Sequence, residues 1–131
     1  MKKINLACLI DDDPVHVFLS KKYLKKTGMI ENLMVFQNGK VAFDNLTAIV
    51  QEGGELPKVI LLDLNMPIWD GWQFLDEFIK IPTKEEITIF ILSSSISQRD
   101  IDKAREYNQV SNYIVKPIKV ENLISLLEGI N

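Results

Sequence analysis

Short apolar runs alternate along this chain with stretches in which apolar residues recur every three or four positions. The runs predict strands at 6–10, 33–36, 59–62, 87–92 and 113–115. Most of them are apolar at every position instead of alternating with polar residues. Such continuous runs are typical of strands buried on both faces, as in parallel sheets.

The stretches between these runs predict helices, and several carry start and stop signals. Asp13 can cap a helix that has Pro14 at its first position, and Gly28 ends that helix. Further helices are expected after Asn38-Gly39, over 71–80, from Ser97 or Gln98 through Tyr107, and from about Val120. The last helix has apolar residues at the spacing i, i+3, i+4, i+7, which indicates one buried face.

The first helix combines apolar and basic residues. Its buried face is predicted to carry four apolar side chains, Val15, Phe18, Leu19 and Tyr23. Its solvent face is predicted to carry four lysines, Lys21, Lys22, Lys25 and Lys26.

Alternating strands and helices predict an α/β protein with a doubly wound, five-stranded parallel sheet covered by helices on both faces. The 131 residues suffice for one domain, and we expect residues 1–131 to form it with no attached output domain. A net charge of −3 provides no electrostatic reason to bind nucleic acid or an anionic membrane. No apolar run approaches the roughly 18 residues of a membrane span. The lone Cys8 fits a reducing, cytoplasmic location.

Polar side chains stand where four of the predicted strands end: Asp11 and Asp12, Asp63, Ser93, and Lys116. The carboxyl ends of parallel strands share one edge of a sheet, so these side chains should converge there. Two carboxylates about 5 Å apart repel by roughly 3 kcal/mol at an effective dielectric near 20. Such a cluster needs a cation, and all-oxygen ligands favour Mg²⁺. A lysine and a hydroxyl would hold phosphoryl oxygens, so the pattern predicts phosphoryl transfer onto a carboxylate.

These residues also carry a family resemblance along the whole chain. It resembles a response-regulator receiver domain, with the acidic pair Asp11-Asp12, the D-x-x-M-P-x-x-D-G run from Asp63 to Gly71, Ser93, and Lys116-Pro117. Tyr113 matches the family's aromatic switch position. The resemblance implies a flavodoxin-like (βα)5 fold with strand order 2-1-3-4-5.

The resemblance implies a role for each residue of the cluster. Asp63 would accept a phosphoryl group from a histidine kinase or a phosphotransfer protein. Four residues would hold Mg²⁺: Asp12 and Asp63 directly, Asp11 through water, and Asn65 through its backbone carbonyl.

Ser93 and Lys116 would bind phosphoryl oxygens, and the Lys116–Pro117 bond would be cis. Phosphorylation would act through Ser93 and Tyr113 on the surface of the fourth helix, fifth strand and fifth helix, which would signal to an unidentified protein partner. Apart from its own phosphorylation and dephosphorylation the protein would not be an enzyme.

Two other interpretations are weighed against this one. The run Asp11 to Val15 resembles the D-x-D-x-[TV] motif of haloacid-dehalogenase-like phosphatases, in which Asp11 would be the nucleophile. The other interpretation is a receiver-like binding module that is never phosphorylated. The single histidine, His16, is expected on the helix surface or partly packed, in preference to a metal ligand or a phosphohistidine.

Overall fold

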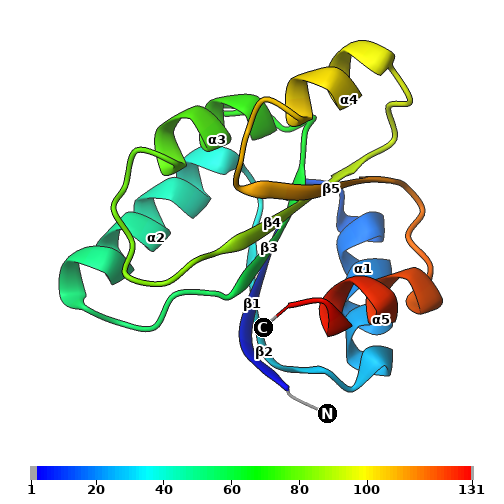
Figure 1. The fold of residues 1–131 in the computed structure, drawn as a ribbon, viewed down its shortest axis with the longest axis horizontal. Coiled ribbons are helices and arrows are strands. Elements are labelled where there is room, and N and C mark those ends of the chain that lie inside the picture. The colour runs from blue at the N-terminus through cyan, green and yellow to red at the C-terminus, as the bar shows by residue number, and fades with distance from the viewer. Residues whose placement is uncertain (1–2, 131) are drawn as a thin grey trace.

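The structure, a computed structural model, describes residues 3–130. Five parallel strands form one sheet in the order β2-β1-β3-β4-β5, as predicted (Figure 1). The strands are β1 (Ile4–Ile10), β2 (Ile30–Phe36), β3 (Val59–Asp63), β4 (Thr88–Ser93) and β5 (Val110–Val115). The helices are α1 (Pro14–Thr27), α2 (Gly39–Glu52), α3 (Gly71–Phe78), α4 (Gln98–Ala104) and α5 (Val120–Glu128).

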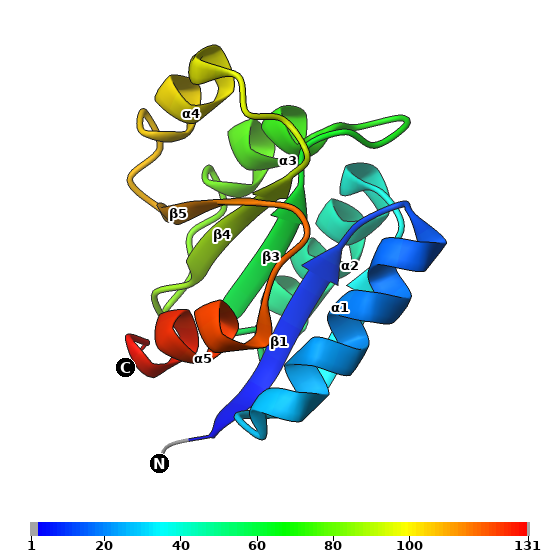
Figure 2. The ribbon, with the colours of Figure 1, turned by 90° about the vertical axis from the view of Figure 1, so that its right-hand side faces the viewer.

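Helices cover both faces of the sheet. Figures 1 and 2 show α1 and α5 on one face and α2, α3 and α4 on the other. Each strand sends alternate side chains to the two sides: Leu61 packs in the core beneath α1 and α5, whereas Ile60 and Leu62 pack beneath α2 and α3. This explains why the central strands are apolar at every position.

The strand register aligns the carboxyl ends of the strands. Ile10 pairs with Leu62, Leu62 pairs with Ile91, and Ile91 pairs with Tyr113. Asp11 and Asp63 directly follow Ile10 and Leu62, and Ser93 lies one residue beyond Leu92, the partner of Asp63, so all three emerge at one edge of the sheet.

Several boundaries differ from those predicted. β1, β2 and β5 each begin two or three residues earlier than expected, and β4 is shifted by one residue. β5 is an edge strand, so its exposed Ser111 and Asn112 can point to solvent while their backbone remains paired. The predicted α3 and α4 are too long: α3 ends at Phe78 and α4 at Ala104.

The predicted buried face of α1 is wrong for two of its four residues, whereas the other two, Leu19 and Tyr23, are partly buried. Val15 and Phe18 are 68% and 66% exposed. The buried residues of α1 are His16, Ser20, Leu24 and Thr27. Asp13 caps the helix, and its Oδ1 accepts the Val15 N–H at 3.0 Å. The mainly polar stripe faces inward, where His16 contacts Asp11. The four lysines are exposed, as expected.

None of the helices within residues 3–130 has the length and hydropathy needed to cross a membrane.

Candidate acidic site at the carboxyl edge of the sheet

Three carboxylates meet at the carboxyl edge of the sheet. Asp11, Asp12 and Asp63 each offer an oxygen atom, and these atoms lie within 4.8 Å of one another. Asp11 and Asp63 are buried, whereas Asp12 is open to solvent. The convergence expected from the strand ends is therefore present.

The loop between β3 and α3 passes close to the backbone of Asp63. The Gly71 N–H donates to the Leu64 carbonyl at 2.9 Å, and a Cβ atom at Gly71 would lie 2.6 Å from the Asp63 carbonyl oxygen. Only glycine allows this approach. Asp70 caps α3 by accepting the Gln73 N–H at 2.9 Å, as its place in the sequence suggests.

Lys116 supplies the positive charge of the site. Its Nζ lies 3.2 Å from Asp11 Oδ2 and 3.5 Å from Asp63 Oδ1. The Lys116 N–H donates to the Ser93 carbonyl at 2.8 Å, which extends the pairing of β4 and β5 by one step. The Lys116–Pro117 peptide bond is cis, as the resemblance implies.

Burial dominates the electrostatics of Asp63. It raises the pKa of Asp63 to about 6, from an ordinary value of 3.8. Lys116 and the backbone N–H of Asn65 oppose this increase in pKa, while the charge of Asp11 adds to it. The Asp63 carboxylate is thus a charged group that lacks enough compensation in the metal-free protein.

Asp11 behaves in the opposite way. Burial would raise the pKa of Asp11, but hydrogen bonds from His16 and the Asp13 N–H, together with the charge of Lys116, lower it below its ordinary value. The His16 contact is short, with Nδ1 2.6 Å from Asp11 Oδ2. His16 is buried, so the expectation of a surface or partly packed residue underestimated its burial. His16 lies about one helical turn after the Asp13 cap. This spacing is the feature of the sequence that could have predicted its position close to the acidic cluster.

Ser93 and Tyr113 lie on neighbouring strands and converge on the loop between β4 and α4. Ser93 is buried, and its Oγ accepts the Ser95 N–H at 3.0 Å. The Tyr113 hydroxyl donates to the Ser95 carbonyl at 3.0 Å, and the Ser95 hydroxyl donates to Asp100 of α4 at 2.8 Å. Hydrogen bonds therefore connect β5 to α4 through one loop residue.

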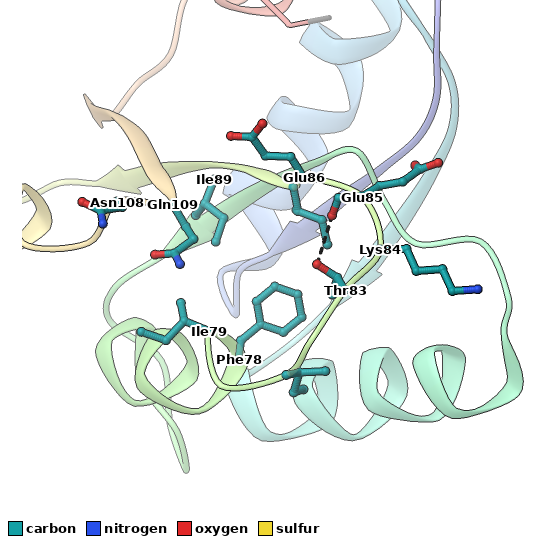
Figure 3. A pocket seen from close by; sticks show the side chains of 11 residues that line it. Phe78, Ile79, Thr83, Lys84, Glu85, Glu86, Ile89, Asn108 and Gln109 are labelled. Carbon is teal, nitrogen blue, oxygen red and sulfur yellow. Dashed lines mark hydrogen bonds between the residues drawn. The ribbon is translucent and has the colours of Figure 1, made fainter.

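A cavity of about 440 Å³ lies at the other end of the sheet (Figure 3). Its lining includes Phe78 at the end of α3, Ile89 near the start of β4, and Gln109 before β5. These residues mark the amino edge of the parallel sheet, so the cavity is separate from the carboxylates.

The donor set suits a hard divalent cation. Two buried carboxylates and one exposed carboxylate provide only oxygen ligands, and the exposed Asp12 leaves a path to solvent. A bound cation would also offset the repulsion that raises the pKa of Asp63.

Comparison with known proteins shows the family. Residues 7–128 match the response regulator receiver domain. The chain belongs to this family, whose members are signalling domains of two-component systems.

Individual relatives agree. The probable methanogenesis regulatory protein FilR2 of Methanothrix harundinacea is 30% identical over 95% of this chain and 80% of its own length. The crystal structure of a two-component response regulator from Cytophaga hutchinsonii has a TM-score of 0.89 and 31% identity, with 98% of each chain covered. Response regulator Rcp1 of Synechocystis is 28% identical over 93% of this chain and 83% of its own. The crystal structure of the Mn²⁺-bound form of response regulator Rcp1 has 27% identity and a TM-score of 0.73, and 96% of this chain and 91% of that chain are covered.

The protein is therefore a response regulator receiver with a phosphorelay signalling role. The comparisons do not support the alternative of a haloacid-dehalogenase-like phosphatase. Asp11, the nucleophile in that alternative, is a fully buried carboxylate already bonded to His16 and Lys116. Receiver domains are in general signalling domains and not enzymes, and they take their phosphoryl group from histidine kinases or phosphotransfer proteins.

Proposed function

We propose that Asp63 is the phosphoacceptor of this receiver. One observation carries the proposal: the Asp63 carboxylate lies at the end of the central strand β3, beside two further carboxylates and 3.5 Å from the Lys116 ammonium group. Asp12 is more exposed than Asp63 but has no comparable contact with the lysine among the described residues. The third interpretation, a module that is never phosphorylated, would leave this arrangement without a use.

The proposed cofactor is Mg²⁺. Asp12 and Asp63 would bind it directly, Asp11 through water, and Asn65 through its backbone carbonyl. When bound, the cation supplies positive charge to the phosphoryl oxygens. The Mn²⁺-bound structure of Rcp1 supports a divalent cation in a related protein.

In the proposed reaction an Asp63 carboxylate oxygen attacks the phosphorus atom of a phosphohistidine. The new O–P bond forms as the N–P bond breaks, and the imidazole leaves with the bonding electron pair. Lys116 and the Ser93 hydroxyl would bind the phosphoryl oxygens. Both are held in place: the Lys116 N–H is bonded to the Ser93 carbonyl, and Ser93 Oγ is bonded to the Ser95 N–H.

The proposed output is a change in the surface formed by α4, β5 and α5. Ser93 and Tyr113 contact the same loop before α4, so movement of the Ser93 hydroxyl toward a phosphoryl group would disturb the Tyr113–Ser95–Asp100 connection. The partners would be a histidine kinase or phosphotransfer protein and a downstream protein. Residues 1–131 would act as one receiver unit without enzymatic turnover of other substrates.

Phosphorylation by a small donor tests the proposal without a cognate kinase. The protein is incubated with acetyl phosphate and Mg²⁺, and the intact mass is measured. We expect the mass of one phosphoryl group on the wild type and none on Asp63→Asn. Asp70→Asn is the matched control, because it removes a nearby exposed carboxylate that serves as a helix cap, and asparagine caps equally well.

The control should be labelled like the wild type. A wild-type protein that takes up no phosphoryl group, or an Asp63→Asn variant that is still labelled, would overturn the assignment of Asp63. Loss of labelling when Mg²⁺ is removed with a chelator is the expected sign of the metal requirement.

A further inference from the structure

His16 makes the shortest contact to the buried carboxylate Asp11. Its Nδ1 lies 2.6 Å from Asp11 Oδ2, in the first turn of α1. Asp11 is fully buried and His16 is 9% exposed, so bulk water does not compete for this contact. A hydrogen bond of this kind to a charged acceptor is stronger than one between neutral groups.

The Asp11 carboxylate receives donors from three directions. Its Oδ1 accepts the Asp13 N–H at 3.0 Å, and its Oδ2 lies within reach of both His16 Nδ1 and Lys116 Nζ, the latter at 3.2 Å. A carboxylate has no proton to donate, so His16 Nδ1 must carry a proton in this contact. The geometry therefore makes Nδ1 the donor atom of His16.

The His16 contact affects how the Lys116 ammonium group is shared between Asp11 and Asp63. Lys116 Nζ lies between two carboxylates, 3.2 Å from Asp11 and 3.5 Å from Asp63. Without His16, Lys116 would be the only side-chain donor to Asp11 Oδ2 among the described residues. The carboxylate would then be free to rotate toward the lysine and draw it from Asp63.

From this geometry we propose that His16 is a positioning residue. It holds the Asp11 carboxylate in the orientation that a metal ion requires and leaves Lys116 available to Asp63. The inference rests on the proposed Mg²⁺ site. Hydrogen bonds to carboxylate ligands commonly affect metal affinity 10- to 100-fold.

Substitutions at position 16 test this role, because they differ in whether they place a hydrogen-bond donor at the position of Nδ1. Asparagine places an N–H donor where histidine has Nδ1, whereas glutamine places one near Nε2. His16→Leu removes the donor and keeps an apolar side chain. Thr27→Ala is the control, because it removes a buried hydroxyl from the same helix whose partners are the Leu24 carbonyl and the Met29 N–H. Ser20 is unsuitable as a control, because its hydroxyl lies 3.4 Å from His16 Nδ1.

Mg²⁺ dissociation constants are measured by titration calorimetry on protein freed of any histidine tag. We expect His16→Leu and His16→Gln to bind Mg²⁺ about 10-fold more weakly than the wild type or worse. His16→Asn should lie within about threefold of the wild type, and Thr27→Ala should equal it. Thermal melts confirm that each variant is folded.

Equal Mg²⁺ affinity in His16→Leu and the wild type, or rescue by glutamine as good as that by asparagine, would overturn the inference. A wild type that binds no Mg²⁺ would instead overturn the metal site of the proposed function. Nitrogen-15 NMR judges the contact separately, because His16 is the only histidine of the chain. A proton on Nε2 and none on Nδ1 would contradict the proposed bond, even if a variant failed to fold.

Discussion

Asp63 shows how a functional residue can work against the stability of the protein that contains it. The residue is 4% exposed, and its pKa is raised to about 6 by burial. At neutral pH the folded protein must hold a charge there that the unfolded chain holds in water at no such cost. Asp11 differs from Asp63, because hydrogen bonds from His16 and the Asp13 N–H help to lower the pKa of the Asp11 carboxyl group.

Asp63→Asn should therefore stabilise the metal-free protein at pH 7.5, by on the order of 1–3 kcal/mol in the free energy of unfolding. The folded-state pKa is raised, so the charge is unfavourable above about pH 6. Below about pH 4 the carboxyl is protonated in both states, and the advantage of asparagine should vanish. Urea unfolding at both pH values, with a chelator present, measures the difference.

Asp70→Asn is the control for this experiment, since the exposed Asp70 is a cap that asparagine can replace. Its unfolding free energy should stay close to that of the wild type at both pH values. An Asp63→Asn variant that is no more stable than the wild type at pH 7.5 would show that Asp63 carries no such cost.

Among the elements, the β3–α3 loop shows the least ordinary backbone. Ile68 has a φ of 69°, and it is the only non-glycine residue with positive φ among residues 3–130. This region of φ is a genuine outlier for a β-branched side chain. Ile68 is also 75% exposed, so no burial of its side chain offsets the strain.

Ile68→Asn should raise the free energy of unfolding by about 1 kcal/mol, because asparagine tolerates the left-handed region. Ile96→Asn is the matched control: Ile96 is 78% exposed and its φ is not positive. We expect that control to change stability by less than about 0.5 kcal/mol. Chemical denaturation measures both, and an equal effect of the two substitutions would show that backbone strain is not the cause.

At the scale of the whole molecule, the core between the sheet and helices α2 and α3 encloses Cys8 completely. Its side chain has no exposure, and burial raises the pKa of its thiol to about 12, from an ordinary value of 9.0. Between these two values the unfolded chain loses a proton that the folded protein keeps. The unfolded state is therefore favoured as the pH rises above 9.

The wild type should lose about 1.4 kcal/mol of unfolding free energy per pH unit above pH 9 that Cys8→Ala does not lose. Comparing the pH slopes of the two proteins between pH 8 and 10.5 removes the contribution of lysines and tyrosines, which titrate in both. Parallel slopes would mean that the thiol ionises in the folded protein as readily as in the unfolded chain.

Much of the fold could be predicted from the sequence, because the relevant signals are local. Continuous apolar runs identify strands covered on both faces, and their alternation with helices leaves few arrangements other than a parallel sheet. That topology alone brings Asp11, Asp12, Asp63 and Lys116 to one edge. Capping residues such as Asp13 and Asp70 were identified for the same reason: their effect involves only the next few residues.

Only the tertiary structure decided how each helix is rotated about its axis and which side chains contact one another in the interior. The sequence of α1 has apolar residues on more than one side, so its periodicity favoured Val15 and Phe18, whereas packing placed His16 against Asp11. The same holds for the raised pKa of Asp63 and the positive φ of Ile68. Each depends on groups brought together by the sheet and its loops, and the sequence by itself does not encode their distances. The sequence alone thus determined which residues reach the edge of the sheet, and the tertiary structure decided which of them touch, because burial and contact depend on the whole fold.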